Sequence, residues 1–552
     1  MQQAVYILLL SLFISMVLVP PLARLAGPLG LTDRPGARKI HQQPIPRSGG
    51  IAIVIGALTP VFFLVTPRPD VLAFLIAAFV LFVFGVLDDR FDLDYRVKLL
   101  GQISASAIVA IGGGVLIESL PFIDGDVLPG FISLPLTIFV IVGITNAVNL
   151  SDGLDGLAGG ISLLALVCLS VLAYQGGDPA ALGIALSMIG ATFGFLRFNS
   201  NPAQIFMGDT GSQFLGFGTA VLVILVTQRP DTVYGQLIPA LILGIPVLDM
   251  ATVMVRRVRA GLSPFRPDRS HLHHRLLSLG WSQYQAVVFI YVMQALMVLA
   301  AYLMRFASDL AVLVVYLAGS IALLWLVHGL LLRVDRCALA ESRGTKASRL
   351  LIGTRSRWIL DKIDCMTDFL GRVPAPMLRI LVPVTLLAGA LLAADVGTDV
   401  GWLAAISLLG LIIALLSRSA LSYWLERLAA YVTVSTVLFL SADPLQSLVE
   451  AGPLLAFFLM LGFVTWAQIR SATEFRTSTL DVLILILMCL LPLSTGMWSG
   501  RYLLVILPCI VLFYAIEVLL AERRGRLGGL HLSILLSLLI VALKSFMGHQ
   551  NV

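Results

Sequence analysis

The chain has 552 residues, of which 59% are hydrophobic and only 12% are charged. A mean hydropathy of +0.97 excludes an ordinary soluble domain, because apolar stretches of about 20 residues, long enough to cross a bilayer, recur along the whole sequence. The net charge of +6 could suggest a nucleic-acid-binding protein. The basic residues instead gather in the loops on one side of the expected membrane, so we expect a lipid bilayer as partner and no nucleic acid.

These stretches predict an all-α polytopic integral membrane protein, because they are too long and too continuously apolar for barrel strands. About eighteen reach spanning length: about eleven form a core before residue 335, and about seven follow it. The first, 4–19, has no Lys or Arg before it. We therefore expect a retained helix with its N-terminus outside, and not a cleaved signal peptide.

Alternating the loops between the two sides of the membrane separates the basic residues. One side holds only Arg68, Arg229, Arg305, Arg501 and Lys544. The other Lys and Arg residues fall on the opposite side, which the positive-inside rule makes cytoplasmic. The polar clusters that follow all fall on this cytoplasmic side.

A basic loop, 32–50, follows the first helix and contains Lys39, His41 and Arg47. Its prolines and glycines argue against a regular element. One interpretation is that the three side chains bind an anionic ligand. The alternative is a positive-inside anchor with no further role.

Two adjacent carboxylates, Asp88 and Asp89, end the third apolar stretch. They repel each other and lie at the negative pole of the helix. A divalent cation or a basic partner would relieve both effects, although exposure to water would also do so. The next helix is expected over 101–116.

A dense polar segment, 145–160, follows another apolar stretch and reads TNAVNLSDGLDGLAGG. It carries Asn149, Asp152 and Asp155 at a membrane boundary, where such a cluster is costly unless it binds something. Its glycines would let the backbone approach a ligand closely.

A glycine-rich turn at 206–212, FMGDTGS, precedes a helix expected to begin near Ser212. Backbone N–H groups of such a turn and of a helix N-terminus bind anions. Asp209 could hold a metal ion that bridges the same anion. The alternative is an ordinary helix cap.

Three histidines, His271, His273 and His274, lie within four residues, and Arg269 and Arg275 flank them. No cysteine lies near and the H-E-x-x-H pattern is absent, so a zinc site is not expected. The cluster is better suited to holding phosphate, unless it is only a basic loop beside the membrane.

The second half of the chain shows no comparable chemistry. Residues 336–376 form a basic cytoplasmic linker in which an amphipathic helix is expected to lie on the membrane surface. Residues 377–552 form a C-terminal transmembrane domain whose role the sequence does not reveal.

Acidic and basic groups on one membrane face predict a phosphoryl-transfer site in which carboxylates hold Mg²⁺ and basic groups stabilise the phosphates. The alternative is a membrane transporter of a lipid-linked or anionic substrate. Transporter sites lie near the bilayer midplane, whereas these acids gather at one face.

Four motifs appear in order: GVLDD at 85–89, NAVNLSDGLDGLAGG at 146–160, FMGDTGS at 206–212 and SPFRPDRSHLHH at 263–274. With them, residues 1–335 resemble the polyprenyl-phosphate N-acetylhexosamine-1-phosphate transferases, more closely the O-antigen-initiating branch than the peptidoglycan branch. The resemblance implies transfer of sugar-1-phosphate from a UDP-N-acetylhexosamine to undecaprenyl phosphate, with release of UMP. It also implies a bacterial inner membrane location, a cytoplasmic active site and a homodimer.

The resemblance also implies roles for single residues. Asp209 would be the ligand of Mg²⁺, for which Mn²⁺ could substitute. Asp88 matches the acid proposed as general base, and Asp89 beside it would support the substrate or the metal. The implied substrate-binding residues are Lys39, His41, Arg47, Asn149, Asp152, Asp155, Phe206, His271, His273 and His274, with Phe206 at the position that stacks on uracil.

Overall fold

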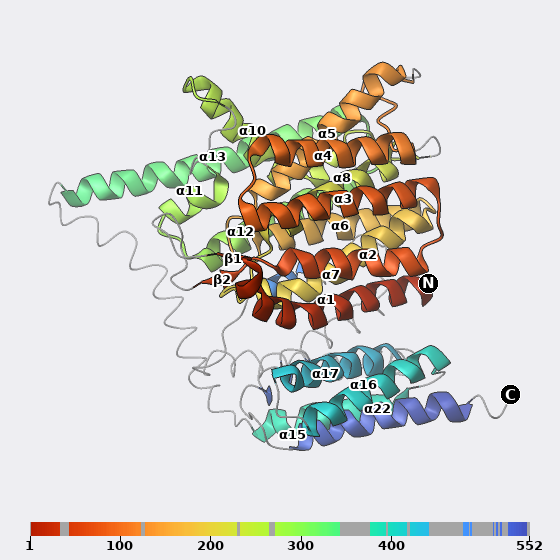
Figure 1. Cartoon of the computed structure of the whole chain (residues 1–552). Coiled ribbons are helices and arrows are strands. Elements are labelled where there is room, and N and C mark those ends of the chain that lie inside the picture. Colours follow the sequence, from red (N-terminus) through yellow and green to blue (C-terminus); the bar gives the residue numbers. More distant parts are fainter. Residues whose placement is uncertain are drawn as a thin grey trace. The chain divides into compact units, whose positions relative to one another are not determined.

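The computed structural model confirms an all-α polytopic membrane protein (Figure 1). It describes residues 2–33, 44–122, 127–228, 232–263, 271–342, 376–393, 396–416, 420–440 and 528–548, with short pieces between 479 and 520. Within these ranges, ten helices are long and apolar enough to cross a membrane. The expected interfacial helix in the linker lies outside the described residues.

Contacts divide the chain into two units: Met1–Leu339 with Ser478–Thr495, and Ala340–Thr477 with Gly496–Val552. In the first unit the structure shows α1 (Gln2–Leu29), β1 (Thr32–Asp33), β2 (Ile45–Pro46), α2 (Gly49–Leu64), α3 (Pro69–Phe91), α4 (Tyr95–Ala107), a π-helical segment (Ile108–Gly112), α5 (Gly130–Leu150), α6 (Leu157–Gln175), α7 (Pro179–Asn199), α8 (Gly208–Thr227), α9 (Ile238–Ile242), α10 (Gly244–Arg259), α11 (Leu272–Ser278), α12 (Gln283–Leu303) and α13 (Asp309–Ser342). In the second it shows α15 (Pro376–Leu392), α16 (Thr398–Leu416), α17 (Ala420–Leu440) and α22 (Gly529–Gly548).

The first unit is built around α8, in which every residue from Thr210 to Thr227 is buried. Its neighbours include α2, α3, α5 and α6, which run beside it in Figure 1. Small residues permit this close packing. A Cβ added to Gly50 would lie 2.2 Å from the backbone nitrogen of Gly211, and one added to Gly85 would lie 2.6 Å from Cα of Thr210. Such contacts replace the hydrophobic effect as the main attraction between membrane helices.

Helices α1 and α4 differ most from the expected boundaries. The first apolar stretch was expected to end at residue 19, but α1 continues to Leu29 through Pro20 and Pro21, as membrane helices allow when neighbours satisfy the freed carbonyls. The helix after the Asp88–Asp89 pair begins at Tyr95 and not at 101, because Asp94 caps it by accepting a hydrogen bond from the backbone nitrogen of Arg96.

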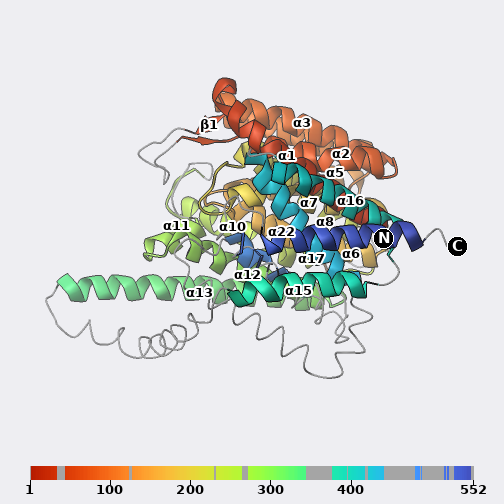
Figure 2. The same cartoon turned by 90° about the horizontal axis from the view of Figure 1, so that it is seen from below.

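Beyond this helical core, the two short strands pair antiparallel, Thr32 with Pro46 and Asp33 with Ile45. They bring the ends of the first loop together beside the start of α2. Helix α13 extends past the other helices of its unit (Figure 2). Its 34 residues exceed the spanning requirement of about 20.

Candidate functional site

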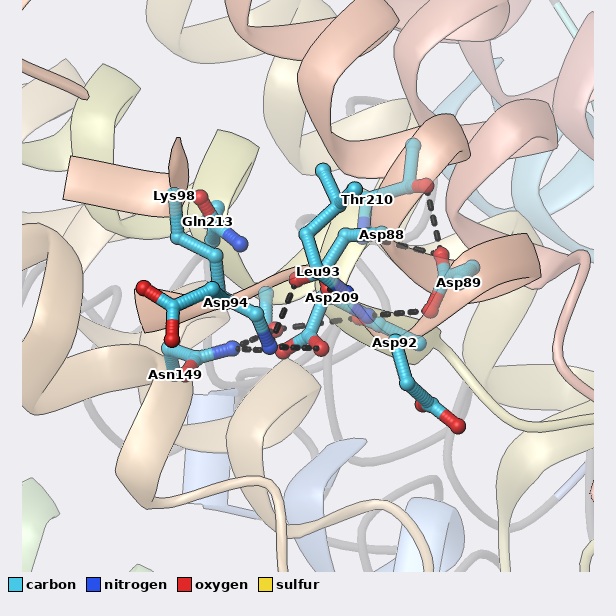
Figure 3. Close-up of polar contacts among 12 residues, drawn as sticks. Asp88, Asp89, Asp92, Leu93, Asp94, Lys98, Asn149, Asp209, Thr210 and Gln213 are labelled. Carbon is cyan, nitrogen blue, oxygen red and sulfur yellow. Dashed lines mark hydrogen bonds and ion pairs between the residues drawn. The ribbon is translucent and has the colours of Figure 1, made fainter. Parts of the chain in front are cut away.

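Two carboxylates and one ammonium group meet where α3 ends and α8 begins (Figure 3). The Lys98 Nζ atom lies 2.8 Å from Oδ2 of Asp88 and 3.3 Å from Oδ2 of Asp209. Asp88 is 1% exposed, and its Oδ1 accepts a hydrogen bond from the backbone nitrogen of Leu93 at 3.0 Å. A buried carboxylate needs such partners. The positive charge of Lys98 therefore offsets the repulsion between the carboxylates of Asp88 and Asp209.

Asp89 faces away from this group and caps α8. Its carboxylate accepts hydrogen bonds from the backbone nitrogens of Asp209 at 2.8 Å and Thr210 at 3.0 Å, and from the Thr210 hydroxyl at 2.5 Å. The two backbone N–H groups are donors that a helix N-terminus leaves unpaired. The cap explains why α8 begins at Gly208, before the expected start near Ser212. Asp89 thereby holds Asp209 in place from another helix.

Asn149, at the end of α5, completes the group around Asp209. Its Nδ2 atom donates to Oδ1 of Asp209 at 2.6 Å and to the Ser212 hydroxyl at 2.8 Å. The structure therefore brings together Asp88, Asp209 and Asn149 from three of the four predicted motifs (Figure 3).

Lys98 was not among the predicted site residues. The sequence interpretation placed it in a loop before 101, whereas α4 carries it on its first turns. The signal that could have found it is Asp94, a good N-cap residue four positions before it.

On the next turn of α4, Gln102 forms a buried amide network: Asn146 Nδ2 donates to its Oε1 at 2.7 Å, and its Nε2 donates to Gln213 Oε1 at 3.1 Å.

Lys98 lies outside the candidate spans. Burial lowers the pKa of its ammonium, but the carboxylates of Asp209 and Asp88 outweigh this effect and raise the pKa above its usual value. The side chain is therefore a permanent positive charge at neutral pH.

The two predicted acids of the next loop have different surroundings. Oδ2 of Asp155 accepts hydrogen bonds from Asn201 Nδ2 at 2.9 Å and from the backbone nitrogen of Ala203 at 3.0 Å, so it fixes the turn before α8. Asp152 is half-buried near other acids. Burial first, and then the charges of Asp209, Asp89 and Asp155, raise its pKa to about 8.

The raised pKa of Asp152 predicts a pH-dependent stability. The folded chain keeps this proton up to about pH 8, whereas the unfolded chain releases it near 3.8. Stability should therefore fall as the pH rises between these two values. We expect Tm of the wild type to fall more between pH 5 and pH 7.5 than Tm of Asp152→Asn. Asp94→Asn, which changes an exposed carboxylate, should keep the wild-type slope; an unchanged slope in Asp152→Asn would contradict the assignment.

The histidine cluster lies against this same loop. A Cβ added to Gly153 would lie 2.3 Å from His273 Nε2. The His273 ring stacks on His271, with centroids 5.8 Å apart, and lies 4.3 Å from the ring of His274. Burial, and then the neighbouring His274, lower the pKa of His273 to about 4. His273 is therefore neutral at pH 7 and supplies packing or hydrogen bonds but no charge.

The first loop is only partly described. Lys39 and His41 lie outside the described residues. Arg47 donates through Nε to Oδ1 of Asp33 at 2.8 Å, and its Nη1 lies 3.4 Å from Oδ1 of Asp92. The predicted anion-binding arginine is thus paired with acids on the hairpin and at the end of α3.

Phe206 lies between this hairpin and α2. Its backbone nitrogen donates to Pro46, and its carbonyl accepts from Gly49. Its side chain is partly buried.

The oxygen atoms of Asp88 and Asp209 are donors of the kind that Mg²⁺ prefers. Among the described residues, no three His, Cys, Asp or Glu side chains are arranged to hold a metal ion. Mg²⁺ does not require such a cage, because one or two carboxylates hold it together with phosphate oxygens of a substrate. Asp88 and Asp209 already share one cation, Lys98. The all-oxygen donor set fits Mg²⁺ and is also suited to Mn²⁺.

Comparisons with known proteins identify the family of this chain. Residues 71–227, which include Asp88, Asn149 and Asp209, match the model of glycosyl transferase family 4. The chain is 38% identical over 303 residues to the probable undecaprenyl-phosphate N-acetylglucosaminyl 1-phosphate transferase of Bacillus subtilis, covering 54% of this chain and 84% of the relative. It is 33% identical over 354 residues to the undecaprenyl-phosphate alpha-N-acetylglucosaminyl 1-phosphate transferase of Escherichia coli K12, covering 61% and 96%.

A mycobacterial relative is similar to the same extent. The decaprenyl-phosphate N-acetylglucosaminephosphotransferase of Mycobacterium tuberculosis H37Rv is 38% identical over 307 residues, covering 49% of this chain and 75% of that protein. These alignments extend well beyond the four short motifs. The chain therefore belongs to the polyprenyl-phosphate N-acetylhexosamine-1-phosphate transferases of glycosyl transferase family 4.

Proposed function

We propose that the chain transfers N-acetylhexosamine-1-phosphate from a UDP-sugar to undecaprenyl phosphate and releases UMP. The observation that carries this proposal is the meeting of Asp88, Asp209 and Lys98 at one end of the helices. The relatives named as N-acetylglucosaminyl transferases favour N-acetylglucosamine as the sugar. The product would start a lipid-linked glycan, such as O-antigen or an exopolysaccharide.

In this proposal an oxygen of the acceptor phosphate attacks the sugar-bearing phosphorus of the donor. The bond between the two donor phosphates breaks, UMP leaves, and the bond between sugar and phosphate is kept. Asp209 and Asp88 would hold Mg²⁺, which when bound stabilises negative charge on the phosphate oxygens. Lys98 adds a fixed positive charge within 3.3 Å of the same carboxylates, and Asn149 orients Asp209.

General base catalysis by Asp88 is not needed for this reaction. A phosphate monoester loses its second proton with a pKa of about 6, so the acceptor is mostly a dianion at neutral pH. The contacts of Asp88 with Lys98 and with the backbone of Leu93 suit a group that orients the cation and the acceptor. Positioning and electrostatic stabilisation would then supply most of the rate.

The proposal places the reaction on the cytoplasmic face of a bacterial inner membrane. The support is the excess of Lys and Arg in the loops at that end. Asp88 and Asn149 lie in the last turns of α3 and α5, and Asp209 lies in the first turn of α8. A site at helix ends is unlike the midplane sites of secondary transporters, which argues against transport by this unit. A homodimer stays a prediction.

The test is UMP release by the purified full chain in lipid nanodiscs. Undecaprenyl phosphate, Mg²⁺ and a panel of UDP-N-acetylhexosamines are supplied, and we expect release with UDP-N-acetylglucosamine. Omitting the lipid acceptor or adding a chelator should abolish it. Absence of UMP with every sugar, under conditions in which the Bacillus subtilis relative is active, would contradict the proposal.

Lys98→Met should lower UMP release about 100-fold, because a fixed charge beside the transferred phosphate is removed. Methionine keeps much of the apolar stem, so the loss reflects mainly the ammonium group. Arg96→Met is the matched control: Arg96 lies on the exposed side of the same helix, over the ring of Tyr95, and its loss should change the rate less than about twofold. Equal rates for the two variants would show that the charge of Lys98 does not contribute to the reaction.

A further inference from the structure

A buried carboxylate outside the acid cluster holds the histidines in place. Asp249 lies within α10 and is 9% exposed, and His271 is 6% exposed. Oδ2 of Asp249 lies 2.9 Å from Nδ1 of His271, and Oδ1 accepts a hydrogen bond from the backbone nitrogen of Leu272 at 2.7 Å. Both carboxylate oxygens are therefore used at the point where α11 begins.

Stacked rings connect this pair to the loop 151–156, which joins α5 to α6. His271 and His273 are nearly parallel, with 10° between their planes. His273 in turn occupies the space next to Gly153, where a Cβ would come within 2.3 Å of it. A cavity beside Asp249 is lined by Ser151, Leu157, Leu272 and His273 among others. A movement of the Asp249–His271 pair would therefore displace His273 and change the packing of the loop that carries Asp152.

The hydrogen bond also determines the chemical form of His271. An ionised carboxylate only accepts hydrogen bonds, so Nδ1 carries the proton, and Nε2 is the nitrogen left for a ligand. A diphosphate oxygen only accepts hydrogen bonds, so it would bind Nε2 when that nitrogen also carries a proton, while Nδ1 keeps its hydrogen bond to Asp249. The same arrangement orients histidines at many metal and catalytic sites.

We propose that Asp249 is a positioning residue for the UDP-sugar: it fixes the orientation and the Nδ1-protonated form of His271, so that the stacked histidines form a preorganised wall for the donor diphosphate. This inference rests on the proposed function. It assigns Asp249 to donor binding, whereas Asp88, Lys98 and Asp209 form the reacting centre about the transferred phosphate.

An asparagine at this position separates positioning from mere packing. The amide has the same shape, and its oxygen can still accept from Leu272. Its NH₂ group would then face Nδ1 of His271, which must become the acceptor, so that the ring proton moves to Nε2. A protonated His271 would have no acceptor at Nδ1. Asp249→Asn therefore changes the chemical form of the histidine with little change in volume.

The experiment uses the full chain with ¹⁵N-labelled histidine in nanodiscs, without substrate and then in the UMP-release assay. His271 is assigned by the signal lost in His271→Gln. We expect its proton on Nδ1 in the wild type and on Nε2 in Asp249→Asn. We also expect KM for the UDP-sugar to rise about tenfold, as for loss of one charge-assisted hydrogen bond, with KM for undecaprenyl phosphate unchanged and kcat within about threefold.

Asp178→Asn is the matched control. Asp178 is also buried, accepts hydrogen bonds from the backbone nitrogens of Ala180 and Ala181, and pairs with Arg68. It lies at the opposite end of α6 from the loop 151–156, about 28 Å away along a helix of 19 residues. This variant should lower Tm and leave both KM values unchanged.

Several outcomes would overturn the proposal. His271 could keep its proton on Nδ1 in Asp249→Asn, or KM for the donor could stay within twofold of the wild type. A drop in Tm and kcat with unchanged KM, as in a packing defect, would also count against it. If the wild type itself releases no UMP, the proposed function fails, whereas an active wild type with an unaffected variant overturns only the role of Asp249.

Discussion

Asp209→Asn should lower the rate of UMP release about 1000-fold. The variant can keep the hydrogen bond from Asn149 to Oδ1, but it replaces the oxygen that faces Lys98 with an NH₂ group. If Asp88 and Asp209 hold Mg²⁺ as proposed, the metal ion would then lose one of its two protein carboxylates. The measurement is initial rate against Mg²⁺ concentration, with UDP-N-acetylglucosamine and undecaprenyl phosphate saturating.

The control for this variant is Asp94→Asn. Asp94 lies nearby in Figure 3, but it is exposed and caps α4, a task that asparagine performs equally well. We expect its Mg²⁺ dependence to match the wild type. Full activity of Asp209→Asn over the same Mg²⁺ range would show that Asp209 is not a metal ligand.

Gly208→Ala should disable the site through the backbone. Gly208 has φ +69°, and an added Cβ would lie 2.5 Å from Oδ1 of Asp89 and 2.8 Å from the carbonyl oxygen of Arg47. The Asp89 carboxylate would have to leave the N-terminus of α8 and release Asp209. We expect UMP release to fall about 100-fold, and stability to fall by about 1–2 kcal/mol for the left-handed conformation with a further 1–3 kcal/mol for the lost hydrogen bonds.

Gly177→Ala isolates the conformational part of this effect. Gly177 has φ +68°, but no atom lies within 4 Å of the position of an added Cβ. It lies at the far end of α6, so the variant should show only the smaller loss of stability, measured by thermal denaturation, and wild-type UMP release. If both variants lost activity equally, the contact of Gly208 with Asp89 would not explain the loss.

Much of the fold could be predicted from the sequence, and so could the proximity of Asp88, Asn149 and Asp209. Hydropathy alone identifies an all-α membrane protein, because the bilayer allows few other structures. The polar motifs end or begin helices, so Asp88, Asn149 and Asp209 had to lie near one membrane face. Successive helices cross the membrane in opposite directions, so the helix ends on one face can be predicted without any knowledge of side-chain packing.

The partners of these residues could not be predicted, because they depend on how the helices rotate and pack. Hydropathy alone places Lys98 in a loop, because it does not take into account that Asp94 caps α4 and starts this helix at Tyr95. Asp249 and His271 are 22 positions apart, and no spacing rule joins them. Likewise, no spacing rule predicts that Arg47 pairs with Asp33 and with Asp92 at the end of α3.

The burial of α8 has a consequence for the response of the enzyme to its lipids. The helix that carries Asp209 meets only protein along Thr210–Thr227, whereas α3 exposes large apolar side chains such as Ile76 and Phe79. Changes in bilayer thickness are met first by tilting of lipid-facing helices, at a cost of fractions of a kcal/mol per Å. We therefore expect the position of Asp209 to depend little on the acyl-chain length of the lipids. Asp88 lies on α3, whose exposed side chains face the lipid, so a change in membrane thickness should displace Asp88 first.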